Sequence, residues 1–189
     1  MTPKERYENY LYKVDPADAL VSMDIKRGVR HVYGITDIHH HLKLLHDSAC
    51  GNVFEIGVRF GVSTSALLSG VEAHGGHLYS VDIDHKCGSA FNHPQWSFKQ
   101  ADSRQDVQAI KHWLPEKLDV LFIDGDHEFI GVDFDLNAYG PMAQVIFLHD
   151  ASQENPGVLE AVNLYLKKPG CRHKLNKIYT ESHGLAVLS

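Results

Sequence analysis

The sequence predicts a three-layer α/β/α sandwich around a seven-stranded, mostly parallel sheet. Short apolar segments alternate with longer helical segments along most of the chain, which is the pattern of a parallel sheet covered by helices on both faces. Two last apolar segments flank Ser182-His183-Gly184, and such a closing hairpin predicts an antiparallel last strand. No repeat or linker interrupts residues 35–189, so we expect one domain there, preceded by an extension over residues 1–34.

Seven segments have the length and composition of strands. The first carries Val53, Phe54 and Ile56 ahead of a turn at Gly57. A strongly apolar segment over residues 118–123 is typical of a strand buried on both faces. The other strands are expected at residues 77–84, 96–101, 144–148, 174–180 and 184–188.

Helices are expected between these strands. The first strand is followed by Ser63, Thr64 and Ser65, which are N-cap candidates for the next helix. Further helices are predicted over residues 104–113, 129–138 and 158–167, each followed by proline or by glycine and proline. Residues 85–95 and 151–157 contain the turn formers of loops.

The segments before the first strand are less regular. Apolar residues at spacings of three and four predict an amphipathic helix over residues 35–47. Its histidines point in different directions, which favours a solvated helix face over a metal site. Residues 1–30 are mixed and polar, with one or two short helices expected. Two interpretations of this extension remain open, a lid over a ligand site and a poorly ordered terminus.

Composition excludes several classes of protein. Eighteen basic and 24 acidic residues give a net charge of −6, which argues against binding to nucleic acid or an anionic membrane. Cys50, Cys87 and Cys171 are far apart, so neither a disulfide framework nor a zinc site follows. The first thirty residues carry charges throughout, and no apolar segment approaches the roughly 20 residues that cross a bilayer. We therefore expect a cytoplasmic protein.

Polar side chains follow five of the predicted strands. They are Glu55, Asp82, Asp102, Asp124 with Asp126, and His149 with Asp150. Because the carboxyl ends of parallel strands share one edge of a sheet, these groups are expected to face one ligand cleft. Gly57 and Gly61 let the backbone turn sharply and approach a ligand closely. A carboxylate beside that turn, Glu55, would repel a phosphate and favours a cationic ligand.

From about residue 35 to its end, the chain resembles the class I S-adenosylmethionine-dependent methyltransferases, which share a Rossmann-like sandwich. Glu55-x-Gly57-x-x-x-Gly61 is similar to their first motif, with Arg59 at a position that is often glycine. The resemblance implies that Asp82 holds the ribose hydroxyls and that Asp102 and Ser103 lie near the adenine. The implied cofactor-binding set is Glu55, Gly57, Arg59, Gly61, Ser63, Asp82, Asp102, Ser103 and Asp124.

The stretch Asp124–Leu136 resembles a subgroup within that fold. Its pattern is DGDH, an aromatic residue, GV and DL, followed by HD at the next strand end; Phe129 stands where tyrosine is common. The subgroup includes sugar O-methyltransferases acting on natural products and glycans, and relatives of cephalosporin-biosynthesis proteins. The resemblance implies a hydroxyl on a sugar or small natural product as the methyl acceptor. The sequence leaves a homo-oligomer open.

The acids at the two later strand ends are also candidates for a divalent metal site. Asp124 and Asp150 are the expected ligands, with His149 as a candidate third. Carboxylates alone suit magnesium, whereas an imidazole ligand admits manganese, iron or zinc. The alternative is that Asp124 and Asp126 only bind backbone N–H groups of turns and helix ends.

Methylation of a hydroxyl also requires removal of its proton. The resemblance places a base-like acid at Asp126, which would lie on the same side of an extended chain as Asp124. His149 is the rival base, because a neutral imidazole suits this role near neutral pH. His127 is given a structural role, at the following helix or beneath the acceptor, in preference to the metal site. Asp135 is expected to be a buried partner that fixes this loop.

The sequence disfavours two other classes of function. A nicotinamide dehydrogenase needs G-x-G-x-x-G after the first strand, which Arg59 and the following residues do not supply. A non-catalytic cofactor- or glycan-binding module is disfavoured by the intact acids at both DGDH and HD, although fold alone never proves catalysis.

Overall fold

The computed structural model describes residues 1–13, 20–24, 29–33, 38–181 and 183–189. Its main sheet has seven strands in the order β5-β4-β3-β6-β7-β9-β8. Strands β3 to β7 are parallel, and β9 runs antiparallel to both β7 and β8. The bounds are β3 Gly51–Ile56, β4 Gly76–Asp82, β5 Trp96–Gln100, β6 Leu118–Ile123, β7 Ala143–His149, β8 Leu175–Tyr179 and β9 Leu185–Leu188. The predicted fold class is confirmed.

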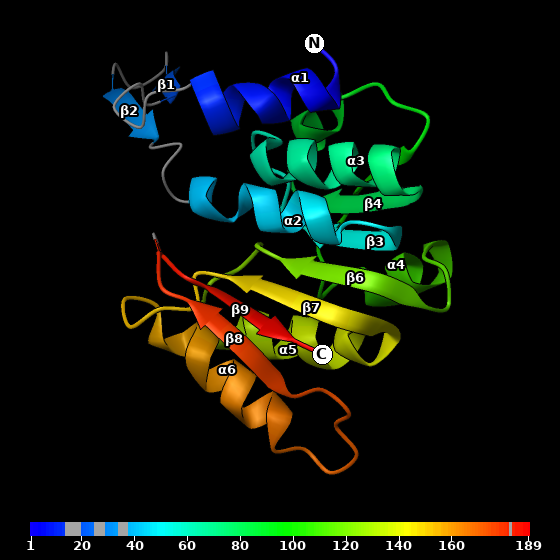
Figure 1. Ribbon diagram of the computed structural model, residues 1–189. Coiled ribbons are helices and arrows are strands. Elements are labelled where there is room, and N and C mark those ends of the chain that lie inside the picture. Colours follow the sequence, from blue (N-terminus) through cyan, green and yellow to red (C-terminus); the bar gives the residue numbers. More distant parts are fainter. Residues whose placement is uncertain (14–19, 25–28, 34–37, 182) are drawn as a thin grey trace.

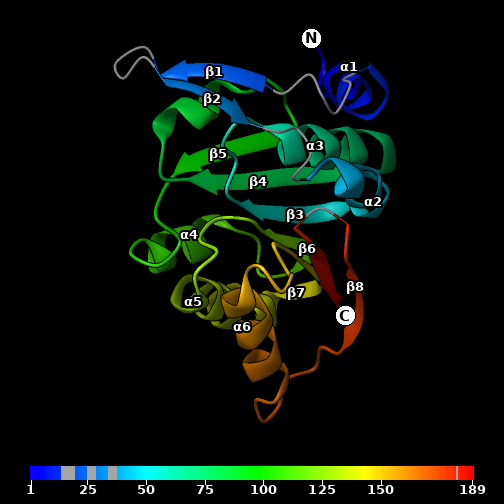
Figure 2. The ribbon, with the colours of Figure 1, turned by 90° about the vertical axis from the view of Figure 1, so that its left-hand side faces the viewer.

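Helices cover both faces of the sheet (Figure 1). On one face lie α1 (Pro3–Glu8), α2 (Leu42–Ser48) and α3 (Val62–His74), and on the other lie α4 (Val107–Trp113), α5 (Phe129–Tyr139) and α6 (Pro156–Leu166). Figure 2, seen from the side to which β6 and β7 point in Figure 1, shows β5, β4 and β3 side by side. No helix of the described residues is long and apolar enough to span a membrane.

The alternation of side chains along each strand builds two apolar layers. Phe54 and Leu121 belong to the layer under α4, α5 and α6, whereas their neighbours Val53, Val120 and Phe122 belong to the layer under α1, α2 and α3. All five are at most 3% exposed. Central strands buried on both faces must be apolar on both faces, which is why these segments read as continuous apolar runs.

Most predicted boundaries agree with the structure to within two residues, and the exceptions have local causes. The helix expected from residue 104 begins at Val107, because the carboxylates of Asp102 and Asp106 accept backbone N–H groups in the preceding turn. The helix after β3 begins at Val62 with left-handed Gly61 (φ 72°) as its N-cap, so Ser63, Thr64 and Ser65 are not caps.

The N-terminal extension also differs from the expectation. Residues 3–8 are helical and a π-helical turn follows (η1, Asn9–Lys13), but β1 (Leu20–Asp24) and β2 (Val29–Tyr33) pair as antiparallel strands where a helix was one expectation. The helix predicted over 35–47 is a 3-10 turn (η2, His39–His41) continued by α2; residues 34–37 lie outside the described residues. Two further 3-10 turns are η3 (His85–Ser89) and η4 (Gly140–Met142).

Asp135 on α5 is buried as expected, but it forms no bond that would fix the neighbouring loop. Its side chain is 1% exposed, and neither carboxylate oxygen has a hydrogen-bond partner in the described part of the chain. Burial raises the pKa of Asp135 to about 7, and the nearby Ser103 side chain and Arg104 charge offset only part of this. Asp126 and Asp102 add to the rise.

This burial predicts a pH-dependent stability. A carboxyl group whose folded pKa is raised stabilises the fold fully below its unfolded pKa and loses that contribution as the pH rises through the folded value. From pH 5 to pH 8, Asp135 should therefore reduce the free energy of unfolding by about 2–3 kcal/mol. Asp135→Asn should remove this part of the pH dependence, as measured by urea denaturation at both pH values.

Glu55 has a similarly raised pKa, but it is present in both proteins, so the difference between them isolates Asp135. An equal loss of stability between pH 5 and pH 8 in wild type and variant would contradict the prediction.

Candidate active site

A cavity of about 1150 Å³ lies at the carboxyl ends of the parallel strands. It exceeds the roughly 300–1,000 Å³ of typical single-ligand pockets, so it has room for a cofactor and a second small molecule. Its wall includes these residues from the predicted set: Gly57, Arg59, Ser63, Asp82, Asp102, Ser103, Asp124 and Asp126. Glu55, Gly61, His149 and Asp150 do not line it.

The turn after β3 is the first part of this wall. Gly57, Arg59 and Gly61 have left-handed backbone conformations, with φ of 93°, 49° and 72°. Gly57 also packs directly on the chain after β6, because a Cβ atom there would lie 2.2 Å from the carbonyl oxygen of Asp124. The two glycines of the predicted motif therefore have different functions: one permits close packing and the other begins α3.

Glu55 lies beneath this turn and does not face the cavity. Its side chain is fully buried and accepts hydrogen bonds from the hydroxyls of Ser63 (2.7 Å), Thr64 (2.9 and 3.1 Å) and Ser80 (2.7 Å). Burial raises the pKa of Glu55 to about 7, against the effect of these hydroxyls. The structure thus gives Glu55 a different position from the expected one at the ligand: its carboxylate joins β3 to the start of α3 and to β4.

Asp82 faces the cavity and also supports the glycine turn. Its Oδ2 accepts the N–H groups of Val58 and Arg59, each at 2.9 Å, and its Oδ1 accepts that of Asp84 at 2.9 Å. Burial opposes ionisation of Asp82, but these backbone bonds outweigh it and lower its pKa. Because a carboxylate has about four acceptor sites, an ionised Asp82 keeps capacity for a ligand hydroxyl.

Asp102 and Ser103, which the resemblance assigns to the adenine, line the cavity after β5. The Oδ1 atom of Asp102 accepts the N–H groups of Arg104 (2.9 Å) and Gln105 (3.1 Å), which lower its pKa. The Tyr139 hydroxyl donates to the carbonyl of Ser103 at 2.7 Å, which fixes this loop on α5. Both residues therefore present a rigid backbone to the cavity.

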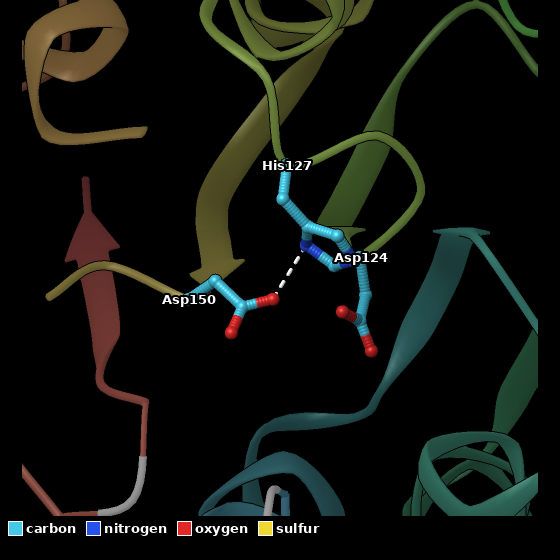
Figure 3. Close-up of side chains that lie close together, drawn as sticks. All are labelled: Asp124, His127 and Asp150. Atoms are coloured by element: carbon cyan, nitrogen blue, oxygen red, sulfur yellow. Dashed lines mark ion pairs between the residues drawn. The ribbon is translucent and has the colours of Figure 1, made fainter. Parts of the chain in front are cut away.

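The two later strand ends bring together Asp124, His127 and Asp150 (Figure 3). Each offers a ligand atom, and these atoms lie within 4.8 Å of one another. His127 Nδ1 is 2.5 Å from Asp150 Oδ2, a contact that raises the pKa of His127. Asp150 has a left-handed backbone (φ 59°), which is uncommon outside glycine and costs on the order of 1–3 kcal/mol. Such strain is typical of functional sites.

His149 lies behind this cluster. Its side chain is 2% exposed, and its Nδ1 is 3.0 Å from Asp124 Oδ1 and 3.4 Å from Asp150 Oδ2. Burial would lower the pKa of His149, but the two carboxylates outweigh it and raise the pKa to about 11. Where the sequence suggested His149 as the third metal ligand, the structure groups His127 with the two carboxylates.

The Asp126 carboxylate contacts the chain just before α5 and the side chain of Arg104. Its Oδ1 accepts the N–H of Glu128 at 3.0 Å, and its Oδ2 is 3.6 Å from Arg104 Nη1. The expectation that Asp124 and Asp126 share one side assumed an extended chain, but residues 124–128 are not part of a strand. Asp126 still lines the cavity, with its side chain 36% exposed.

The comparisons with known proteins agree with this fold. The Methyltransf_24 family, described as a methyltransferase domain, matches residues 54–151. The chain belongs to this family and is an S-adenosylmethionine-dependent methyltransferase. No curated protein matches the sequence.

Several solved structures share the fold. An O-methyltransferase from Bacillus cereus in complex with S-adenosylhomocysteine (SAH) is 16% identical, with a TM-score of 0.66 over 98% of this chain and 95% of that one. An SAH-bound methyltransferase from Podospora anserina is 11% identical, with a TM-score of 0.64 over 98% and 86%. A TDP-rhamnose 3′-O-methyltransferase of calicheamicin biosynthesis is 15% identical, with a TM-score of 0.57 over 79% and 75%.

Proposed function

We propose that this methyltransferase transfers the methyl group of S-adenosylmethionine to a hydroxyl group on a sugar or small natural product, assisted by a divalent cation. The observation that carries the proposal is the cluster of Asp124, His127 and Asp150 beside the cofactor cavity. The fold likeness to O-methyltransferases, one of which acts on a rhamnose hydroxyl, supports a hydroxyl acceptor.

The donor set of this cluster fits a small divalent cation. Two carboxylates provide the oxygen ligands that magnesium and manganese prefer, and an imidazole shifts the preference toward manganese or iron. Buried His149 holds Asp124 and Asp150 in place from behind through its Nδ1. A bound cation would act as a Lewis acid that lowers the pKa of an acceptor hydroxyl.

The other residues bind and orient the reactants. Asp82 and the glycine turn bind the cofactor, whose sulfonium carries the activated methyl group. We assign proton removal to Asp126, because its partly exposed carboxylate lines the cavity and is not grouped with the cation ligands. His149, the rival base, is disfavoured because its side chain is 2% exposed, its Nδ1 faces two carboxylates, and it does not line the cavity.

The test of this function is methyl transfer from radiolabelled S-adenosylmethionine to a panel of hydroxylated sugars and phenols. We expect transfer to at least one acceptor, loss of transfer after exhaustive chelation, and recovery on addition of manganese or magnesium. Transfer that survives chelation would contradict the cation's part in the proposal. Binding of SAH without transfer to any hydroxyl would favour a non-catalytic module or another acceptor class.

Asp82→Asn is expected to weaken SAH binding by about 2–4 kcal/mol, because the variant loses ribose hydrogen bonds and part of the support of the glycine turn. Calorimetric titration of SAH would measure this. Asp84→Asn is the matched control, because Asp84 lines the same cavity but, among the backbone N–H groups of the described residues, its carboxylate accepts only that of Lys86, at 2.9 Å. Equal affinities for the two variants, or tighter binding of NAD than of SAH, would contradict the assignment.

A further inference from the structure

The N-terminal helix α1 carries an arginine that joins two loops of the cofactor cavity. Arg6 Nη2 donates to the carbonyl of Phe60 at 2.6 Å, and Arg6 Nη1 donates to that of Ala90 at 3.1 Å. Phe60 belongs to the glycine turn after β3, and Ala90 ends the η3 turn that follows Asp82. One guanidinium therefore connects the loops that follow β3 and β4.

Arg6 is itself held in place from two sides. Its Nε donates to the Tyr10 hydroxyl at 3.2 Å, and its guanidinium lies 4.9 Å from the ring centroid of Phe91. The helix that carries it is anchored on the domain, because Tyr7 and Tyr10 are each 7% exposed in the core under α3, and the Tyr7 ring stacks on His46 at 4.6 Å. A planar guanidinium can bond two acceptors at once, which an ammonium group does with less geometric control.

The glycine turn is thus held from two sides. On the cavity side, Asp82 accepts the N–H groups of Val58 and Arg59. Arg6, which lies outside the cavity wall, donates to the carbonyl of Phe60, and the Cys87 thiol of η3, which itself lines the cavity, donates to the carbonyl of Arg59 at 3.2 Å. The bonds of Arg6 are charge-assisted and therefore stronger than those between neutral groups.

We propose that Arg6 is a positioning residue for cofactor binding, which keeps the glycine turn and the loop after Asp82 at the separation that the cofactor requires. The N-terminal helix then supports the cofactor site from outside. The proposal rests on S-adenosylmethionine as the cofactor, but not on the acceptor or the cation.

Arg6→Gln is expected to weaken SAH binding about tenfold, because a neutral amide cannot form both charge-assisted bonds. The KM for S-adenosylmethionine should rise by a similar factor, with kcat at saturating cofactor unchanged within about twofold. Arg6→Lys should fall between wild type and Arg6→Gln. Lys4→Gln is the matched control on the same helix, because Lys4 is 67% exposed and its only described ion pair is with Glu8 at 3.9 Å.

A second pair of measurements separates positioning from general stability. Tyr7→Leu removes the stack on His46 and should lower the melting temperature, but it retains Arg6 and should weaken SAH binding less than Arg6→Gln does. Arg6→Gln should instead speed amide hydrogen exchange over residues 57–61, which Lys4→Gln should not. Unchanged SAH affinity in Arg6→Gln, or affinity that falls equally in Tyr7→Leu, would overturn the proposal. Absence of SAH binding by the wild-type protein would overturn the cofactor assignment as well.

Discussion

Asp150→Asn is expected to reduce methyl transfer by about 100-fold or more while SAH affinity changes little. Asp150 lies within 4.8 Å of Asp124 and His127 through their ligand atoms, so the variant loses one of the two carboxylates that would bind the proposed cation. It also removes the negative charge that His127 contacts at 2.5 Å and His149 at 3.4 Å. Turnover would be measured at saturating cofactor, and the affinity for Mn²⁺ would be measured by calorimetry. Both the turnover and the Mn²⁺ affinity should be lower in the variant.

Two further variants make this prediction specific. Glu154→Gln is the control, because Glu154 is an acid of the neighbouring loop that pairs only with His183 at 3.1 Å among the described residues, and it should retain wild-type turnover. Asp126→Asn should lose turnover by a factor similar to Asp150→Asn but retain Mn²⁺ affinity, because it is assigned to proton removal. Full activity in Asp150→Asn would show that the cluster has no catalytic part.

Gly57→Ala is expected to destabilise the fold by about 4 kcal/mol or more, the largest effect on stability that we predict. A left-handed conformation at φ 93° already disfavours any side chain. The new Cβ atom would also lie 2.2 Å from the carbonyl oxygen of Asp124, so the turn after β3 must separate from the chain after β6. Urea denaturation would measure the loss, and SAH binding should fall with it.

Gly75→Ala is the matched control for backbone strain alone. Gly75 also has a left-handed φ of 84°, but a Cβ atom there would meet nothing within 4 Å. Because its ψ of 138° lies outside the left-handed helical region, Gly75→Ala should cost about 1–3 kcal/mol from backbone strain alone. If Gly57→Ala destabilises the protein no more than Gly75→Ala does, the contact between the two strand ends is looser than the structure shows.

The architecture could be predicted from the residues alone. Buried strands such as Leu118–Ile123 must be apolar on both faces, so the residues of the segment itself are enough to predict the strand. The acids at the ends of β4, β5, β6 and β7 could also be predicted to lie along one edge of the sheet, because parallel strands end on the same side. These residues also carried the resemblance to the S-adenosylmethionine-dependent methyltransferases, and the family match confirms that class.

Which of these side chains reach the cavity depends on the packing of distant segments and could be seen only in the three-dimensional structure. Glu55 does not reach the cavity because the alternation of side chains along β3 turns it toward α3. There the hydroxyls of Ser63 and Thr64 donate to its carboxylate, and neither residue caps the helix. His127 lies beside Asp124 and Asp150 because the chain leaves the strand after β6, so the period-two argument for Asp124 and Asp126 fails there. His149 contacts the same two carboxylates from the buried side. Arg6 had no sequence signal at all, since its partners are the backbone carbonyls of distant loops, which any residue type would offer. A strand can be recognised from the residue types within it, whereas the direction of a side chain that follows a strand depends on long-range packing.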